Sequence, residues 1–329
     1  MKLLEIHNLT AQYKTDLETV HAVNDISLSI DRGESLGLVG ETGAGKTTTA
    51  LSILQLLPKP VGEILSGSVH FDGKDLMKAT DLEMQAIRGD KISMIFQDPM
   101  TALNPVMTVG EQISEALELH AEKNVSKEEL EKEVDKVLNM VGIHPERKKD
   151  YPHQFSGGMK QRVIIAMALV CQPQLLIADE PTTALDVTIQ AQVLALIKNL
   201  KRKLGTAMLM ITHDFGVVAQ TCDHVAVMYA GEIVEHAAVY DMMKEGRHHP
   251  YTEGLFKSIP NLEEPSKRLH PIPGAMPNPT DLPKGCSFSP RCAYCTERCK
   301  TEKPGVWSDG SHQIRCFRYC GGEPDADDK

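Results

Sequence analysis

Short apolar runs alternate with longer amphipathic stretches along most of the chain. Residues 3–9 and 20–30 alternate apolar and polar side chains, which is the pattern of half-buried β-strands. Residues 35–39 are predicted to form a short buried strand. Residues 175–178 and 207–211 are continuous apolar runs, as in parallel strands buried on both faces. Three more short strands are expected, at residues 67–71, 92–96 and 225–228. A polar loop containing Tyr13 is expected between the first two strands.

Helical patterns separate several of these strands. Residues 48–57 and 188–204 have helical length and composition. Residues 101–152 change character and are predicted to be helical, with capping boxes that pair Thr108 with Glu111 and Ser126 with Glu129. Strands that alternate with helices in this way predict an α/β domain with a mainly parallel sheet.

One loop carries a clear phosphate-binding pattern. Residues 40–47, Gly-Glu-Thr-Gly-Ala-Gly-Lys-Thr, fit G-x-x-x-x-G-K-[ST] and lie between a predicted strand and a predicted helix. Glycines let backbone N–H groups turn around a phosphate, and the helix N-terminus adds partial positive charge. Lys46 is expected to reach the β- and γ-phosphates, and the Thr47 hydroxyl is expected to hold Mg²⁺.

Two further motifs bear on nucleotide chemistry. The strand at residues 175–178 is followed by Asp179, expected to bind Mg²⁺, and by Glu180, expected to polarise the attacking water. Upstream of that strand, residues 155–162 read Phe-Ser-Gly-Gly-Met-Lys-Gln-Arg and open an apolar helix. Ser-Gly-Gly at a helix start can form a second anion site from backbone N–H groups.

In this order the motifs resemble those of ATP-binding-cassette (ABC) ATPases, and residues 155–162 resemble their signature motif, with Phe155 and Met159 as departures. The resemblance implies that Gln97, Glu180 and His213 are catalytic, that Asp186 belongs to a loop that pairs across a dimer, and that Mg²⁺ is held by Thr47, Gln97 and Asp179. The implied contacts to ATP are Tyr13, Gly40, Glu41, Thr42, Gly43, Ala44, Gly45, Lys46, Thr47, Thr48 and Gln97, with Ser156, Gly157 and Gly158 acting from a second cassette.

The resemblance is closer to the ATPase subunits of dipeptide and oligopeptide importers. It is carried by residues 181–192, by His249-Pro250-Tyr251-Thr252 and by the segment from Gly285 to Cys292. It implies a P-loop NTPase (RecA-like) core, a β-subdomain and an inserted α-helical subdomain at about residues 100–160. The nucleotide-binding domain is then expected over residues 1–248, and a cysteine-rich C-terminal extension over residues 249–329.

Six of the eight cysteines lie between residues 286 and 320. Cys286, Cys292, Cys299 and Cys316 have the spacing C-x5-C-x6-C-x16-C, which resembles the cysteine module of this importer branch. The resemblance implies a four-iron four-sulfur (4Fe-4S) cluster that stabilises a proline-rich tail. Zinc is the alternative metal, with Cys295 as a possible ligand, and thiols without a metal are the third alternative. Cys320 also lies nearby.

Composition adds limits on partners. The net charge of −10 argues against nucleic-acid binding. The longest apolar run, residues 163–171, is too short to cross a bilayer, and no signal-peptide core follows Met1. We therefore expect a peripheral protein on the cytoplasmic face of the membrane.

The resemblance implies an ATPase that powers peptide import with two membrane permeases, a second ATPase subunit in a heterodimer, and an extracytoplasmic peptide-binding protein. A nickel or metal-chelate importer and a soluble, non-transport ABC ATPase are the alternatives. The sequence does not define the length of the peptide.

Overall fold

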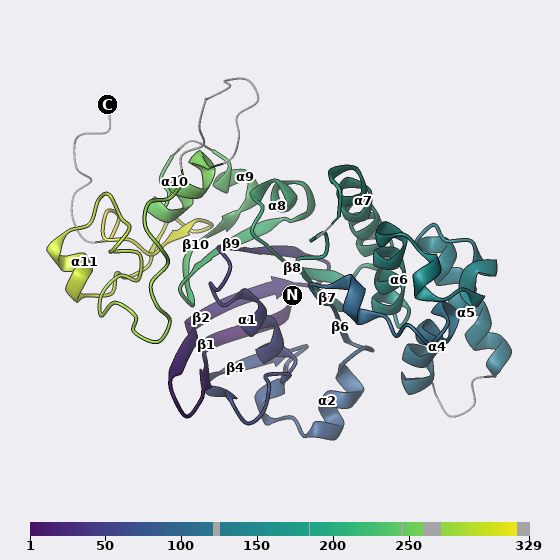
Figure 1. Cartoon of the computed structure of the whole chain (residues 1–329). Helices are drawn as coiled ribbons and strands as arrows, with labels where there is room; N and C mark the ends of the chain where they lie inside the picture. Colours follow the sequence, from purple (N-terminus) through teal and green to yellow (C-terminus); the bar gives the residue numbers. More distant parts are fainter. Residues whose placement is uncertain (121–125, 184, 245, 259–270, 321–329) are drawn as a thin grey trace. The chain divides into compact units, whose positions relative to one another are not determined.

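The computed structural model describes residues 1–120, 126–183, 185–244, 246–258 and 271–320 (Figure 1). It divides into two compact units. The first comprises residues 1–4, 29–35 and 70–211, and the second comprises residues 5–28, 36–69 and 212–329. No helix in the described ranges has both the length and the apolar character needed to cross a membrane.

The first unit has a parallel sheet and a group of helices. Strands β6 (Ile92–Ile95), β7 (Leu175–Asp179) and β8 (Ala207–Thr212) are hydrogen-bonded in the order β6-β7-β8. The register pairs Ile95 with Ala178 and Asp179 with Ile211. Since parallel strands end at the same edge, the residues that follow β6 and β7 lie close together.

The helices of this unit are α2 (Asp81–Ile87), α3 (Pro99–Ala102), α4 (Val109–His120), α5 (Lys127–Met140), α6 (Gly157–Leu169) and α7 (Val187–Leu204). Helices α4, α5 and α6 pack against one another, and α6 also contacts β6 and α7 (Figure 1). Both predicted capping boxes are present. Thr108 and Ser126 each accept a hydrogen bond from the backbone N–H three residues later, and Glu111 and Glu129 reach back. Short 3₁₀ turns cover Leu76–Lys78, Pro145–Lys149 and Pro152–Gln154.

The second unit builds a mixed sheet around the strand before the phosphate loop. Strand β3 (Ser35–Val39) pairs in parallel with β9 (His224–Tyr229), and β9 pairs antiparallel with β10 (Glu232–Ala238). The sheet continues through β12 (Gln313–Ile314) to β11 (Trp307–Ser308). The C-terminal segment therefore supplies two strands to this sheet. The unit's helices are α1 (Lys46–Ile53), α8 (Phe215–Thr221), α9 (Val239–Met242), α10 (Pro250–Lys257) and α11 (Glu297–Thr301).

Long antiparallel strands complete the fold. In the second unit, most of β1 (Lys2–Lys14) lies between β2 (Thr19–Asp31) and β4 (Gly62–Phe71). The last two residues of β4 belong to the first unit, where they pair with β5 (Lys74–Asp75). The prediction of a polar loop around Tyr13 is wrong, because β1 continues to Lys14. Helix α1 is shorter than predicted and ends at Ile53, since Gln55 takes a left-handed conformation with φ 51°.

The core of the second unit includes residues of the C-terminal extension. Tyr251 and Phe288 pack with Val39, Val227 and Tyr229, and all five are buried. The rings of Tyr229 and Tyr251 lie 4.6 Å apart. The proline-rich extension therefore shares the core that supports the phosphate loop.

Candidate nucleotide site and cysteine cavity

The phosphate loop joins β3 to α1 and is packed tightly against neighbouring backbone. Gly45 is the N-cap of α1 with φ 102°, a left-handed conformation that favours glycine. A Cβ at Gly45 would lie 2.2 Å from the carbonyl oxygen of Ala22, and one at Gly40 would lie 2.2 Å from that of Met228. Glycine is thus required at both positions for steric reasons.

Lys46 folds back over the loop. Its buried side chain donates from Nζ to the carbonyl oxygens of Gly40, at 2.7 Å, and Glu41, at 2.9 Å. Thr47, the expected Mg²⁺ ligand, is exposed. Thr48 is buried, and its Oγ1 lies 3.2 Å from the hydroxyl of Tyr13. The structure therefore brings Tyr13 to the first turn of α1, from the end of β1.

The remaining loop residues differ in exposure. Thr42 and Gly43 are exposed, whereas Ala44 is buried. The N–H of Ala44 donates to the carbonyl of Glu41, at 3.1 Å, and its own carbonyl accepts from the N–H of Gly231. His213, exposed and one residue beyond β8, belongs to the same unit.

The predicted acidic residues lie in the other unit, at the end of β7. Asp179 is 2% exposed, and Glu180 follows it with φ 45°. This is an uncommon conformation for a residue with a side chain, of the kind found at functional sites. Glu180 Oε2 accepts hydrogen bonds from Gln97 Nε2, at 3.2 Å, and from Thr183 Oγ1, at 2.9 Å. The parallel strands thus bring together two of the three residues expected to be catalytic.

The signature segment starts α6 in the same unit as these acids. Ser156 is its exposed N-cap and makes no side-chain capping bond. Gly157 is also exposed, and a Cβ at Gly158 would lie 2.5 Å from Cγ2 of Ile189 in α7. Asp186 is the N-cap of α7, where its Oδ1 accepts from the N–H of Ile189 at 3.0 Å. Ala184, within the predicted dimer loop, lies outside the described residues.

The four predicted cysteine ligands line one cavity of about 420 Å³, together with Phe288, Tyr294 and Phe317 among others. These four are Cys286, Cys292, Cys299 and Cys316. Burial raises the pKa of Cys286 to about 12 and that of Cys316 to about 11. Thiolates at these positions would therefore need a positively charged partner such as a metal.

The other two cysteines of the extension each lie next to a backbone carbonyl, and the thiol of Cys295 also lies next to that of Cys299. Cys295 Sγ lies 3.5 Å from the carbonyl oxygen of Thr296, and Cys320 Sγ lies 3.1 Å from that of Gly305. The lining of the cavity, as far as the described residues show it, includes neither of them.

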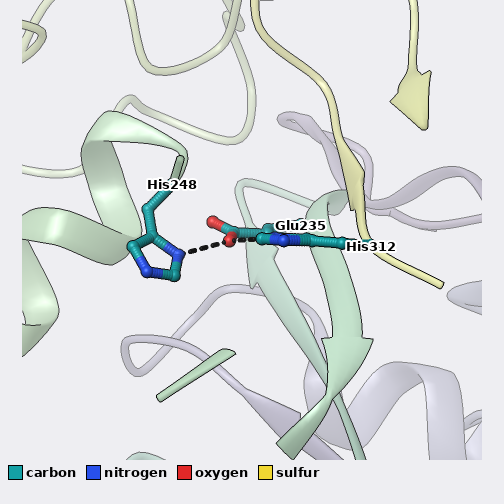
Figure 2. A group of neighbouring side chains, drawn as sticks. All are labelled: Glu235, His248 and His312. Carbon is teal, nitrogen blue, oxygen red and sulfur yellow. Dashed lines mark hydrogen bonds and ion pairs between the residues drawn. The ribbon is translucent and has the colours of Figure 1, made fainter. Parts of the chain in front are cut away.

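A buried cluster that sequence reasoning missed lies nearby, where β10, the start of α10 and β12 meet (Figure 2). Glu235 Oε1 is 2.8 Å from His248 Nδ1 and 2.7 Å from His312 Nε2. Its Oε2 accepts from the backbone N–H of His249 at 2.8 Å. Burial acts to raise the pKa of Glu235, but the hydrogen bonds from His248 and His312 outweigh it and bring the pKa to about 2.

These three side chains could in principle hold a metal, since their donor atoms all lie within 4.8 Å of one another. Two ligand atoms around a tetrahedral zinc, with bonds of about 2.0–2.1 Å, lie about 3.3 Å apart. The observed 2.7 and 2.8 Å are hydrogen-bond distances. We therefore describe the cluster as a hydrogen-bonded triad. No local sequence pattern joins Glu235 to His312, which are 77 positions apart.

Comparisons with known proteins agree with this geometry. The family described as "ABC transporter" matches residues 23–183, and the family "Oligopeptide/dipeptide transporter, C-terminal region" matches residues 234–299. The oligopeptide transport ATP-binding protein AppD of Bacillus subtilis is 48% identical over 320 residues, covering 96% of this chain and 97% of its own length. The oligopeptide transport ATP-binding protein OppD of Haemophilus influenzae is 50% identical over 301 residues, covering 91% of each chain.

Solved structures give the same result for the cassette. The dimeric ATP-binding cassette MJ0796 bound to ADP and phosphate superimposes with a TM-score of 0.64 at 30% identity, covering 72% of this chain and 98% of that one. CbiO1 of Clostridium perfringens gives a TM-score of 0.64 at 29% identity, covering 74% and 91%. The expected P-loop NTPase fold is therefore confirmed, and the chain belongs to the ABC transporter ATPases, within the family of oligopeptide and dipeptide transport ATP-binding proteins.

Proposed function

We propose that this chain hydrolyses ATP to power the import of dipeptides or oligopeptides through a membrane transporter. The observation that carries the proposal is a match along 96% of the chain to a transport ATP-binding protein, together with a phosphate loop whose glycines and Lys46 are in place. The metal-chelate importer and the soluble ATPase fit less well, because the C-terminal family match is to oligopeptide and dipeptide transporters.

The phosphate loop is the binding element in this proposal. Backbone N–H groups of the loop and of the first turn of α1 hold the β- and γ-phosphates, and Lys46 exchanges its loop carbonyls for phosphate oxygens. Thr47, Gln97 and Asp179 are the residues that would hold Mg²⁺, which neutralises phosphate charge. Tyr13 contacts the adenine.

Glu180 is the proposed general base. Its carboxylate is oriented by hydrogen bonds from Gln97 and Thr183, so that it can accept a proton from the attacking water. His213 contacts the γ-phosphate. Ser156, Gly157 and Gly158 of a second cassette complete the phosphate contacts, and Asp186 lies at that dimer contact.

The proposed partners follow from the transporter role. They are two membrane permeases, a second ATPase subunit that forms a heterodimer with this chain in the cell, and an extracytoplasmic peptide-binding protein. Association is peripheral, on the cytoplasmic face, because the permeases provide the path across the membrane.

The cysteine cavity is proposed to hold a 4Fe-4S cluster through Cys286, Cys292, Cys299 and Cys316. A cavity of about 420 Å³, lined by these four cysteines, leaves room for such a group. The cluster would act as a structural link between segments of the extension.

The function is tested by peptide uptake in a strain that lacks the gene. The wild-type chain should restore uptake, and Glu180→Gln should not. In the purified protein, Glu180→Gln should lower hydrolysis by about 10²–10⁴-fold while ATP still binds, because the amide cannot accept the proton. Lys46→Ala should instead weaken nucleotide binding. Normal turnover by Glu180→Gln would overturn the role of Glu180, and uptake unchanged by loss of the gene would overturn the transport function.

The cluster is tested by anaerobic purification. The protein should be brown and contain iron and acid-labile sulfide, and Cys286→Ser should lose both. Cys295→Ser is the matched control and should keep them. A colourless preparation with one zinc per chain would exclude the cluster.

A further inference from the structure

The C-terminal extension holds the phosphate loop from outside, at Glu41. Arg291 Nη1 donates to Glu41 Oε2 at 2.8 Å, and Nη2 donates to Oε1 at 3.2 Å. The Arg291 side chain is 5% exposed and that of Glu41 is 31% exposed. A two-point guanidinium–carboxylate contact of this kind is among the strongest ion pairs in proteins. The phosphate-loop pattern does not require it, because Glu41 occupies a variable position of that pattern.

A second residue of the extension holds the backbone of Glu41. The hydroxyl of Tyr251, which is fully buried, accepts a hydrogen bond from the N–H of Glu41 at 2.9 Å. The carbonyl of Glu41 in turn accepts from Lys46 Nζ at 2.9 Å and from the N–H of Ala44 at 3.1 Å. The N–H, the carbonyl and the side chain of Glu41 are therefore all engaged. Lys46 Nζ rests on the carbonyls of Gly40 and Glu41, so the backbone on both sides of Glu41 contributes to its position.

Arg291 is itself held in place. Its Nε donates to the carbonyl of Pro273 at 2.9 Å, and Nη2 also lies 3.3 Å from the carbonyl oxygen of Ile272. Nη1 lies 3.5 Å from the hydroxyl of Tyr229, at the end of β9. Since the guanidinium is planar and its donors are fixed, these contacts preorganise the pair with Glu41.

The segment that holds Arg291 also lies against the phosphate loop. A Cβ at Gly43 would lie 3.3 Å from Cε of Met276. The backbone N–H of His21 donates to the carbonyl of Pro279 at 2.9 Å. The extension therefore passes close to the loop at Gly43 and contacts it at Glu41.

Charge adds a second effect. A carboxylate next to a phosphate-binding loop repels the phosphates of a nucleotide, and the guanidinium of Arg291 neutralises it. Loss of Arg291 alone would release the loop and also leave the charge of Glu41 unbalanced. Loss of both side chains would remove the repulsion without restoring any contact.

We propose that Arg291 is a positioning residue of the nucleotide site, which acts through Glu41 to hold the backbone of the phosphate loop in the conformation that binds nucleotide. The proposal rests on the proposed function in that the loop binds ATP. Because Cys292 follows Arg291 and lines the cysteine cavity, nucleotide binding and the conformation of that module are coupled, and the coupling acts in both directions.

The direct test is the affinity of the full-length protein for a fluorescent ADP analogue with Mg²⁺. Arg291→Ala should raise Kd about tenfold or more and speed dissociation of the nucleotide. Arg291→Lys should be intermediate, because an ammonium cannot make the two-point contact. The double variant Glu41→Ala/Arg291→Ala should recover part of the affinity, which a purely structural role of Arg291 would not produce.

Lys300→Ala is the matched control. Lys300 also carries one positive charge in the extension, but it forms an exposed pair with Glu297. Its removal should leave Kd within about twofold of wild type. Binding by Arg291→Ala and Arg291→Lys that equals wild type would overturn the proposal and leave the proposed function intact, whereas a wild-type protein that binds no nucleotide would overturn the proposed function.

The coupling is tested separately by hydrogen exchange. In the wild-type protein, ADP should slow exchange in residues 286–299 as well as in residues 40–48. Arg291→Lys keeps the positive charge and is the variant more readily expected to fold. In this variant, ADP should slow exchange in residues 40–48 but not in residues 286–299. If ADP does not change the exchange rate of residues 286–299 in the wild-type protein, the coupling is overturned.

Discussion

The two partners of His248 favour its doubly protonated form. Its Nδ1 faces Oε1 of Glu235 and its Nε2 faces the carbonyl oxygen of Lys244, at 2.9 Å. Both partners are acceptors, so both ring nitrogens must donate. Burial acts to lower the pKa of His248, but the hydrogen bond to Glu235 outweighs it, and the pKa is raised above its usual 6.5.

This pair predicts a defined pH window of stability. The contribution of His248 is present below about pH 6.5 and is lost as pH rises through its raised folded pKa. That of Glu235 is present above about pH 4.5 and is lost as pH falls towards about 2. His248→Gln should therefore destabilise the protein most between pH 4.5 and 6.5, by about 1.5–3 kcal/mol, and less above that range.

Unfolding can be followed by the fluorescence of Trp307, the single tryptophan, whose ring lies 6.4 Å from that of His312. His144→Gln is the control, since that side chain is 70% exposed in the other unit. An equal loss of stability for His248→Gln at pH 5.5 and pH 9 would contradict the assignment of charge.

Single residues also show what sequence can predict here. The places of Lys46, Asp179 and Glu180 in the fold were predictable because each lies within a few positions of the strand or helix that orients it, whereas their roles stay predictions. Gln97 was predicted only through family resemblance. Glu41 and Arg291 are 250 positions apart, and Glu235 and His312 are 77 apart. Periodicity and motif spacing report only local neighbours, so neither contact could be derived.

At the scale of elements, the start of α6 is packed closely on α7. A methyl group at Gly158 would lie 2.5 Å from Cγ2 of Ile189, a β-branched side chain with little rotamer freedom in a helix. Gly158→Ala should therefore shift the signature segment and cost about 1–3 kcal/mol of stability. We expect ATP to bind as in wild type, because the phosphate loop belongs to the other unit. Hydrolysis should fall strongly, because the displaced signature segment is the one proposed to complete the phosphate contacts. Thermal unfolding and ATPase assays measure the two effects.

A compensating change tests this packing. The double variant Gly158→Ala/Ile189→Ala should lose less stability than the two single variants lose together, because the second change removes the colliding Cγ2. Gly157→Ala is the steric control for folding, since its Cβ would lie 3.9 Å from Leu185. Wild-type stability and hydrolysis in Gly158→Ala would show that the signature segment tolerates the displacement.

Elements were predicted well where a strand is short and buried on both faces. The runs that became β3, β7 and β8 have no polar interruption, so their limits were close to those observed. Helix α2 was missed although Thr80 and Glu83 form a capping box, because seven residues leave too little periodicity to detect. The predicted end of β1 was wrong, because cross-strand pairing, which the sequence does not reveal, continues the strand past Tyr13.

At the scale of the whole molecule, one chain carries both halves of an ATP site, and the two halves are expected to face each other only in a dimer. The phosphate loop is proposed to bind ATP, and the signature segment is proposed to contact ATP held by another cassette. The MJ0796 structure that resembles this chain is described as dimeric, and we propose that this chain also acts as a dimer. The ATPase rate per chain should therefore rise steeply with protein concentration, or on addition of the partner subunit.

Mixing two inactive variants gives the sharper form of this prediction. Lys46→Ala retains an intact signature segment, and Ser156→Arg retains an intact phosphate loop. A mixed dimer contains one site in which both halves are wild type. If the two variants pair at random and each site acts alone, half of the dimers are mixed and one of their two sites works, so about a quarter of the wild-type rate should return. ATPase measurements across mixing ratios should peak at equal amounts, whereas either variant alone stays inactive at every concentration. Full activity of Ser156→Arg alone would mean that each chain hydrolyses ATP without its neighbour's Ser156. Activity of the mixture that never exceeds the sum of the separate variants would mean that two copies of this chain do not complete each other's sites.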